Sequence, residues 1–373
     1  MRRPPLHLAA LLFAVSLLPA CSMQPVVEAD YNPGVYAVEG QYIWDSWIVE
    51  DEGTLHRYAL SAPTEGYGPN DRHQHAFVRH AISKDGGRSW EDLGPAIEPQ
   101  PKGTWPDHVI WTSSVMLRKD PKGRKEFLMF ITGRSGGNED WTQQIGLARS
   151  RDGHNYSVPE VILSPEESHG YDITDGDGII MAWRDPFVIQ DPKDSRWHML
   201  FSAKSKDECG IIRPTVGHAV AEDESLTRWR LEPPMELPQY YRQVEVPYML
   251  HRGDNYYLFV STQANPRMQE NAGKEAAFRG YVSENIDGPW ELIYQDTDRV
   301  YGHKIYAPTL FEKARGSGDY GAVTFFSEDT GCPITGTPIV DIDWDTEGLP
   351  RFEFDRDLGP CLIQSPASTG ARQ

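Results

Sequence analysis

A hairpin-turn motif recurs along this 373-residue chain and constrains its fold more than any other feature. The stretch Ser83–Trp90 (SKDGGRSW) returns as Ser150–Tyr156 (SRDGHNY) and, more loosely, as Ser283–Trp290 (SENIDGPW). In this motif an Asp takes the first turn position, a Gly supplies a positive φ, and the terminal aromatic ring packs back over the hairpin. The repeat predicts a series of similar antiparallel hairpins and gives these residues a structural role.

Short runs rich in aromatic and β-branched residues, such as Val109–Leu117 and Asn255–Thr262, lie between the turns and predict strands. The 33 Gly and 29 Pro residues are dispersed, as many tight turns require. Only Gln269–Phe278 is predicted to form a short helix. Because repeated hairpins with short edges suit radial repetition, we expect a single all-β domain, a β-propeller, over residues 33–373.

The first residues resemble a targeting segment. Arg2 and Arg3 precede the apolar stretch Leu8–Leu18, which is too short to span a bilayer. Leu18-Pro19-Ala20-Cys21 then resembles the cleavage site of bacterial lipoproteins. We therefore predict a signal peptide over residues 1–20, a lipidated Cys21 and a tether over 21–32. An exported protein facing the periplasm or cell surface would then reach the membrane only through its lipid anchor. The alternative is ordinary secretion, with Cys21 incidental.

The chain is acidic, which limits the ligands it can bind. Its net charge is −19, and −21 once the signal peptide and its two arginines are removed. Nucleic acids need a positive field, so we expect no nucleic-acid partner and instead a small neutral substrate. We also expect the protein to be a monomer. In an oxidising compartment Cys332 and Cys361 can form a disulfide, although pairings with Cys209 stay open.

Three carboxyl groups stand beside aromatic or proline residues, far apart in the sequence. They are Asp45 in Trp44-Asp45-Ser46-Trp47, Asp185 in Arg184-Asp185-Pro186, and Glu245 in Val244-Glu245-Val246-Pro247. Strand alternation would place Asp45 and Trp47 on one face, where both can line a cleft. Each motif by itself also fits a solvated strand residue or a turn. Together they suit glycoside hydrolysis, which needs two carboxyl groups in different protonation states.

These motifs, with Ser83–Gly87, Ile110–Ser114, Asn255–Phe259 and Tyr281–Ser283, resemble glycoside hydrolase family 68, the levansucrases and related β-fructosyl enzymes. The likeness covers roughly residues 40–345 and implies a five-bladed β-propeller, as in the related families 32 and 43. It implies that Asp45 is the nucleophile, Glu245 the general acid and base, and Asp185 the residue that stabilises the transition state. The residues expected to bind substrate are Trp44, Trp47, Trp111, Thr112, Arg184 and Arg267.

The chain departs from the family on the acceptor side. Glu245-Val246-Pro247 stands where Glu-Arg-Pro is usual, which favours hydrolysis or short transfer over polymer growth. The expected substrate is sucrose or a short fructan. Two alternatives stay open: a furanoside hydrolase acting on arabinofuranosides, and a surface lipoprotein that binds glycans without cleaving them. No zinc spacing or nucleotide-binding loop is present, so we expect no metal and no cofactor.

Overall fold

The computed structural model describes residues 33–136, 142–174, 181–239, 241–263, 277–293, 306–326, 333–346 and 348–352. The predicted signal peptide, Cys21, the tether, Arg267, Cys332 and Cys361 lie outside these ranges, and Cys209 is exposed. Within them, no helix is long and apolar enough to cross a membrane.

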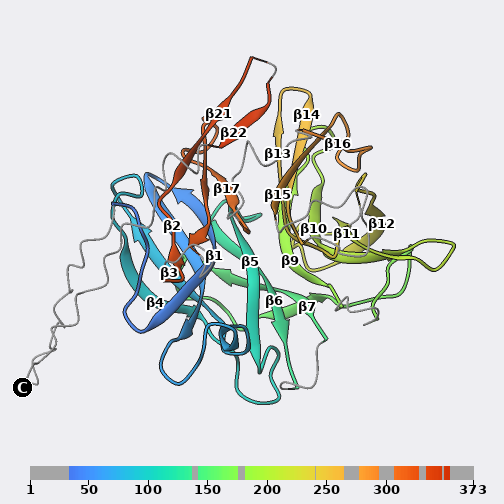
Figure 1. Cartoon of the computed structure of the whole chain (residues 1–373). Helices are drawn as coiled ribbons and strands as arrows, with labels where there is room; N and C mark the ends of the chain where they lie inside the picture. Colours follow the sequence, from blue (N-terminus) through green and yellow to red (C-terminus); the bar gives the residue numbers. More distant parts are fainter. Residues whose placement is uncertain are drawn as a thin grey trace, which may run out of the picture.

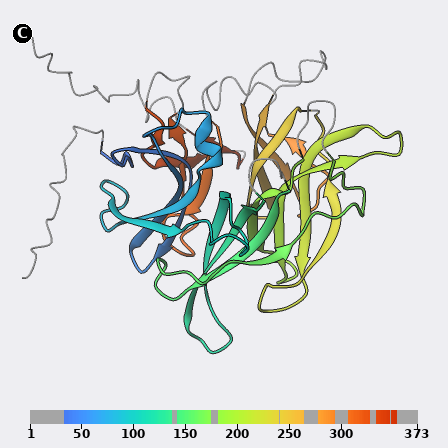
Figure 2. The same ribbon diagram turned by 90° about the horizontal axis from the view of Figure 1, so that it is seen from below.

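Five four-stranded antiparallel sheets are arranged around a common centre, which confirms the predicted five-bladed β-propeller (Figure 1). In each blade the first strand lies nearest the centre (Figure 1), and Figure 2 shows the same blades from below. Blade 1 contains β1 (Gln41–Asp51), β2 (Thr54–Pro63), β3 (Phe77–Ser83) and β4 (Glu91–Ile97). Blade 2 contains β5 (Val109–Lys119), β6 (Lys125–Arg134), β7 (Gln144–Ser150) and β8 (Glu160–Leu163).

The remaining blades follow in chain order. Blade 3 contains β9 (Arg184–Gln190), β10 (Trp197–Lys206), β11 (Ile212–Ala221) and β12 (Trp229–Met235). Blade 4 contains β13 (Gln243–Arg252), β14 (Asn255–Gln263), β15 (Ala277–Ser283) and β16 (Glu291–Leu292). Blade 5 contains β17 (Thr309–Glu312), β18 (Tyr320–Val323), β21 (Val340–Trp344) and β22 (Pro350–Phe352), and a small sheet pairs β19 (Phe325–Phe326) with β20 (Thr335–Gly336).

The repeated turn motif has the structural role that its sequence predicts, because it joins the third and fourth strands of a blade. In blade 1 the carboxylate of Asp85 accepts the backbone N–H groups of Arg88 and Ser89, each at 3.0 Å. Asp152 caps the corresponding turn of blade 2 in the same way. Asp223 makes equivalent bonds in blade 3, a copy that the sequence does not reveal because no glycine follows it.

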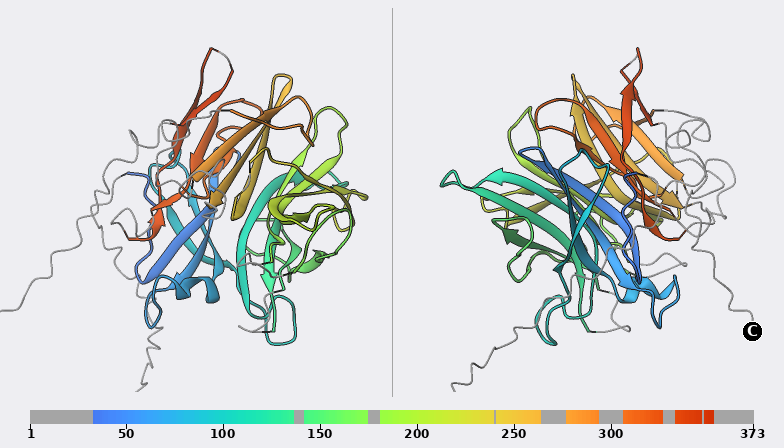
Figure 3. Two further views of the ribbon diagram at one scale, coloured as in Figure 1. Left: turned by 45° about the vertical axis from the view of Figure 1, so that its right-hand side comes forward. Right: turned by 90° about the vertical axis from the view of Figure 1, so that its left-hand side faces the viewer.

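The ring closes where the start of the described chain meets blade 5. Tyr36 pairs with Gly336 of β20 through backbone bonds of 3.0 and 2.9 Å. The buried guanidinium of Arg57 in β2 donates to the Thr337 carbonyl at 2.8 Å. A Cβ at Gly336 would lie 2.2 Å from Arg57 Nη2, so a larger residue there would have to displace the buried guanidinium. The first and last blades therefore lie side by side (Figure 3).

The predicted helix over Gln269–Phe278 is not supported where the structure describes it. Ala277 and Phe278 begin strand β15, which runs antiparallel to β14. The rest of that stretch lies outside the described residues. Among the described residues the single helical segment is the 3₁₀ turn η1 (Asp71–Gln74), in the connection between β2 and β3.

Candidate active site

A pocket of about 360 Å³ brings the three predicted carboxyl groups together. It is lined by Trp44, Asp45, Leu60, Asn70, His73, Gln74, Trp111, Thr112, Arg184, Asp185, Glu245, Val246 and Tyr306. A larger cavity of about 600 Å³ is lined by residues at the hairpin turns of blades 2 and 3, with Arg315, and contains none of the candidate residues. The smaller pocket is therefore the candidate site.

Bulges in the innermost strands direct these side chains into the pocket. The pairing of β1, β5, β9 and β13 with the second strand of each blade shifts register near the pocket. Asp45, Asp185, Val246 and Ala307 have positive φ angles of 31°, 58°, 50° and 48°. A bulge leaves two residues opposite one and locally breaks strand alternation. As a result, Asp45 and Asp185 each line the pocket together with the residue before them.

Asp45 is held by a hydroxyl group from the neighbouring blade. Thr112 Oγ1 donates to Asp45 Oδ2 at 2.5 Å. Burial raises the pKa of Asp45 to about 7; the Thr112 bond lowers the pKa, whereas the charge of Asp185 raises it further. Near pH 7 this carboxyl group therefore exchanges between its protonated and ionised forms.

Glu245 is fixed by three side chains. Arg184 Nη2 donates to Glu245 Oε1 at 2.7 Å, and Gln263 Nε2 donates to Oε2 at 3.3 Å. The hydroxyl of Tyr306 also donates to Oε2. A cation therefore does contact Glu245, although the neighbouring Val246 supplies none.

Asp185 is the most enclosed of the three carboxyl groups, with 5% of the residue exposed. Its Oδ2 accepts bonds from Ser202 Oγ at 2.6 Å and from the backbone N–H of Val246 at 3.1 Å. Burial raises its pKa, and Arg184, whose Nε is 3.6 Å from Oδ2, only partly opposes this effect. An adjacent arginine alone would lower the pKa of Asp185. The pKa is raised instead because burial of the carboxyl group has the larger effect.

The connection between β2 and β3 supplies the remaining wall of the pocket. His73 packs edge-on against Trp44 with ring centroids 5.7 Å apart, and its carbonyl accepts the indole N–H of Trp111 at 2.7 Å. Gln74 accepts a bond from Arg134 at 3.3 Å, and Arg134 also lies over the Trp111 ring. This segment therefore fixes both indole rings that face the pocket.

The structure brings together most of the predicted site residues but not all of them. Trp44, Trp111, Thr112 and Arg184 line the pocket with the three carboxyl groups. Trp47 does not: it is 3% exposed, lies in the hydrophobic core and stacks on Tyr58. The prediction for Trp47 was wrong because the bulge at Asp45 changes the alternation on which it relied. Arg267 lies outside the described residues.

Sequence reasoning missed several residues of the pocket wall, including Asn70, His73 and Gln74. They lie on an irregular segment with no strand period, so no pattern marks them. Tyr306 was not missed, because the stretch His303–Tyr306 is a candidate for contacts to an acceptor sugar. Tyr306-Ala307-Pro308 also has the same form as Arg184-Asp185-Pro186 and Glu245-Val246-Pro247. In each of these tripeptides the first residue lines the pocket and the second has a positive φ.

A five-bladed propeller with three carboxyl groups in one central pocket is the arrangement implied by the resemblance to family 68. No family model matches the chain. A levansucrase of Zymomonas mobilis is 22% identical over 311 residues, covering 72% of this chain and 70% of that protein. An extracellular sucrase of the same species is 23% identical over 312 residues, covering 72% of each.

A solved structure gives the same picture of the fold. The inulosucrase from Halalkalicoccus jeotgali bound to kestose superposes with a TM-score of 0.66 at 21% identity, over 86% of this chain and 89% of that one. The chain is thus similar to levansucrases in sequence, which confirms the resemblance to family 68.

The raised pKa of Asp45 predicts a pH-dependent effect of Asp45→Asn on stability. Because the folded pKa of about 7 exceeds the ordinary value of 3.8, folding favours the protonated form, and this stabilisation is lost as the pH rises between those values. The Asn variant carries no such charge. Its free energy of unfolding relative to wild type should therefore rise from pH 4 to pH 7, by at most about 4 kcal/mol.

Denaturant unfolding at a series of pH values measures this difference. Asp85→Asn is the matched control, since turn hydrogen bonds lower the pKa of Asp85 to about 2 and its contribution is lost only as the pH falls from about 4. Asp85→Asn should therefore destabilise the protein at neutral pH. Its free energy of unfolding relative to wild type should fall as the pH rises, whereas that of Asp45→Asn should rise. A difference between Asp45→Asn and wild type that does not change with pH would contradict the assignment.

Proposed function

We propose that this chain is a retaining glycosidase that cleaves sucrose or short β-fructosides through a fructosyl-enzyme intermediate. The observation that carries the proposal is the meeting of Asp45, Asp185 and Glu245 in one pocket, beside two indole rings. The relatives from Zymomonas mobilis support the sugar, since one is a levansucrase and the other an extracellular sucrase. Cleavage of a glycosidic bond with retention needs one carboxylate as nucleophile and a second carboxyl group as acid and base.

In the first step, Asp45 attacks the anomeric carbon of the fructosyl unit. The bond from that carbon to the leaving-group oxygen breaks, and protonated Glu245 gives its proton to this oxygen. In the second step the Glu245 carboxylate takes a proton from water or a sugar hydroxyl, whose oxygen displaces Asp45. Thr112 holds Asp45, and Tyr306 and Gln263 hold Glu245, so that both carboxyl groups keep fixed positions in the pocket.

The charge of the pocket suits the transition state of this reaction. Three carboxyl groups line the pocket; the guanidinium of Arg184 contacts two of them, and the charge of Arg72 acts on Asp45. An anomeric carbon acquires positive charge as the glycosidic bond breaks, and the negative pocket stabilises that charge more than it stabilises the neutral substrate. Asp185, held by Ser202 and Val246, fits a role in binding hydroxyl groups of the sugar.

Two alternatives differ in substrate or chemistry. Arabinofuranosides have a similar ring, but relatives named as a levansucrase and a sucrase do not favour them. A protein that binds glycans without cleaving them has no need for a nucleophile aligned by Thr112 or for a Glu245 bound by three side chains. Both alternatives predict that sucrose releases no glucose.

We predict that hydrolysis and short transfer products dominate when sucrose is supplied at high concentration. Val246 lines the pocket beside Glu245 but offers an acceptor sugar no hydrogen-bond donor from its side chain. Nearly equal amounts of free glucose and free fructose are expected, and Val246→Arg should raise the share of transferred fructose several-fold.

Separate assays of glucose and fructose, with size analysis of the products, measure this partition. Val246→Met is the control for size, because it adds length without a hydrogen-bond donor. Abundant long polymer from the wild type would contradict the proposed bias, and the absence of glucose would contradict the proposed substrate.

We also propose that the protein is exported and anchored by Cys21, with residues 1–20 as signal peptide, 21–32 as tether and 33–373 as the catalytic domain. The motif Leu18-Pro19-Ala20-Cys21 supports this, as does the relative named an extracellular sucrase. Wild-type protein should fractionate with membranes, and Cys21→Ser should be released, whereas Cys209→Ser should behave like wild type. Wild-type protein that is wholly soluble after export would leave only a cleaved signal peptide.

A further inference from the structure

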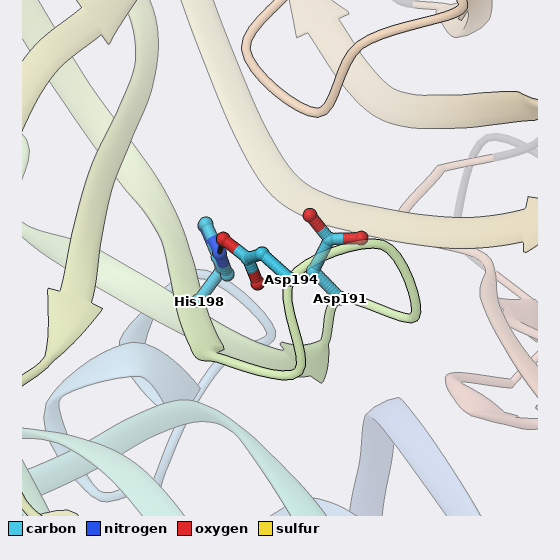
Figure 4. Close-up of side chains that lie close together, drawn as sticks. All are labelled: Asp191, Asp194 and His198. Atoms are coloured by element: carbon cyan, nitrogen blue, oxygen red, sulfur yellow. Dashed lines mark ion pairs between the residues drawn. The ribbon is translucent and has the colours of Figure 1, made fainter.

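The hairpin between β9 and β10 holds three side chains that no step of the proposed reaction uses. Asp191, Asp194 and His198 place one potential ligand atom each within 4.8 Å of one another. Asp194 Oδ2 is 3.5 Å from His198 Nε2. Figure 4 shows the imidazole of His198 beside the Asp194 carboxylate, with Asp191 on the same turn.

The imidazole of His198 is buried and held in one orientation. Only 2% of the residue is exposed, and its Nδ1 forms a hydrogen bond with His218 Nε2 at 2.8 Å. Its Nε2 has no hydrogen-bond partner in the part of the chain that the structure describes. Buried polar atoms are normally paired because an unpaired one costs free energy. This nitrogen faces a carboxylate, so a cation between them would satisfy both.

The equivalent hairpin of blade 2 shows how the same turn is built without such a site. Asp120 begins it as Asp191 begins the hairpin of blade 3, in the sequence Asp-Pro-Lys. There Arg124 and Arg151 each lie 2.9 Å from the Asp120 carboxylate and neutralise it. Asp191 is 4% exposed and forms no ion pair with any residue in the described ranges. Among the residues described, the blade 3 hairpin therefore has a buried carboxylate that no cationic side chain neutralises.

We propose that Asp191, Asp194 and His198 bind a divalent transition-metal ion of the zinc class. One imidazole nitrogen and two carboxylate oxygens, completed by water, are ligands that such ions accept, whereas Ca²⁺ and Mg²⁺ take oxygen ligands. With metal–ligand distances of about 2.0–2.2 Å, adjacent tetrahedral ligands lie about 3.4 Å apart. The separation of 3.5 Å between His198 and Asp194 matches that edge. The sequence does not predict this site, because the spacing of the three residues matches no standard zinc pattern.

The surroundings of the cluster fit a metal site. His218 fixes the ring of His198 from behind, as outer groups do for metal-bound imidazoles. Asp191 Oδ1 accepts the Lys193 N–H at 2.9 Å and the Tyr256 hydroxyl, which orients its carboxylate. Arg196 Nε lies 2.6 Å from Asp194 Oδ2, on a side chain that is 54% exposed. Binding of the ion displaces this arginine into solvent.

Calorimetric titration of tag-free, metal-stripped mature protein with Zn²⁺ tests the proposal. We expect one saturable site, a higher unfolding temperature with Zn²⁺ than with Ca²⁺, and a visible spectrum when Co²⁺ replaces Zn²⁺. His198→Gln and Asp194→Asn should each weaken Zn²⁺ binding about 10–100-fold. Asp194 is partly exposed, so its variant should fold even where a change at His198 disturbs the core. Asp120→Asn is the matched control and should bind Zn²⁺ like wild type.

The variant Arg196→Gln should change the affinity for Zn²⁺ in the opposite direction. If the ion displaces Arg196, removing that competing cation should tighten Zn²⁺ binding several-fold. The absence of saturable Zn²⁺ binding would overturn the proposal. So would Zn²⁺ binding that survives both Asp194→Asn and His198→Gln, or a stabilising effect of Ca²⁺ equal to that of Zn²⁺.

Discussion

The candidate site depends on a backbone constraint: the innermost strands leave regular β geometry where they reach the pocket. Asp185 and Ala307 adopt positive φ angles, and each donates its N–H to a hydroxyl of the preceding blade, on Thr132 and Ser261, at 2.8 Å. Such conformations cost about 1–3 kcal/mol each and persist only where the surroundings hold them. Hydrogen bonds between blades therefore maintain the site geometry, and closure of the ring stabilises the site.

A second constraint follows from placing three carboxyl groups in one enclosed space. Burial raises the pKa of Asp45 and Asp185, and Arg184 is shared between Asp185 and Glu245. Gathering these carboxyl groups in an enclosed pocket lowers the stability of the folded protein. Their negative charge instead stabilises a positively charged transition state, and such shifted pKa values are typical of catalytic sites. Thr112 and Ser202 limit the cost, because each donates a hydrogen bond to a carboxylate.

The sequence predicts the blades and the carboxyl groups well, because both follow from local patterns. The turn residues Asp85 and Asp152 form the hairpins that their motif indicates, and Asp45, Asp185 and Glu245 meet as the resemblance implied. Alternation fails for Trp47, since a bulge depends on contacts between blades that no local pattern encodes. The sequence does not predict the pocket wall around His73 for the same reason, because contacts with Trp44 and Trp111 set the position of this segment.

The central claim is that Asp45 forms a covalent bond to the sugar, and mass spectrometry of a trapped intermediate tests it most directly. Glu245→Gln lacks the base that activates water, so a fructoside whose leaving group needs no proton should load the enzyme faster than the intermediate is hydrolysed. Rapid acid quenching and peptide mapping should then find a fructosyl group on the peptide that contains Asp45, and none after Asp45→Asn is added. A label on any other residue, or product released with inverted configuration and no label, would contradict the account.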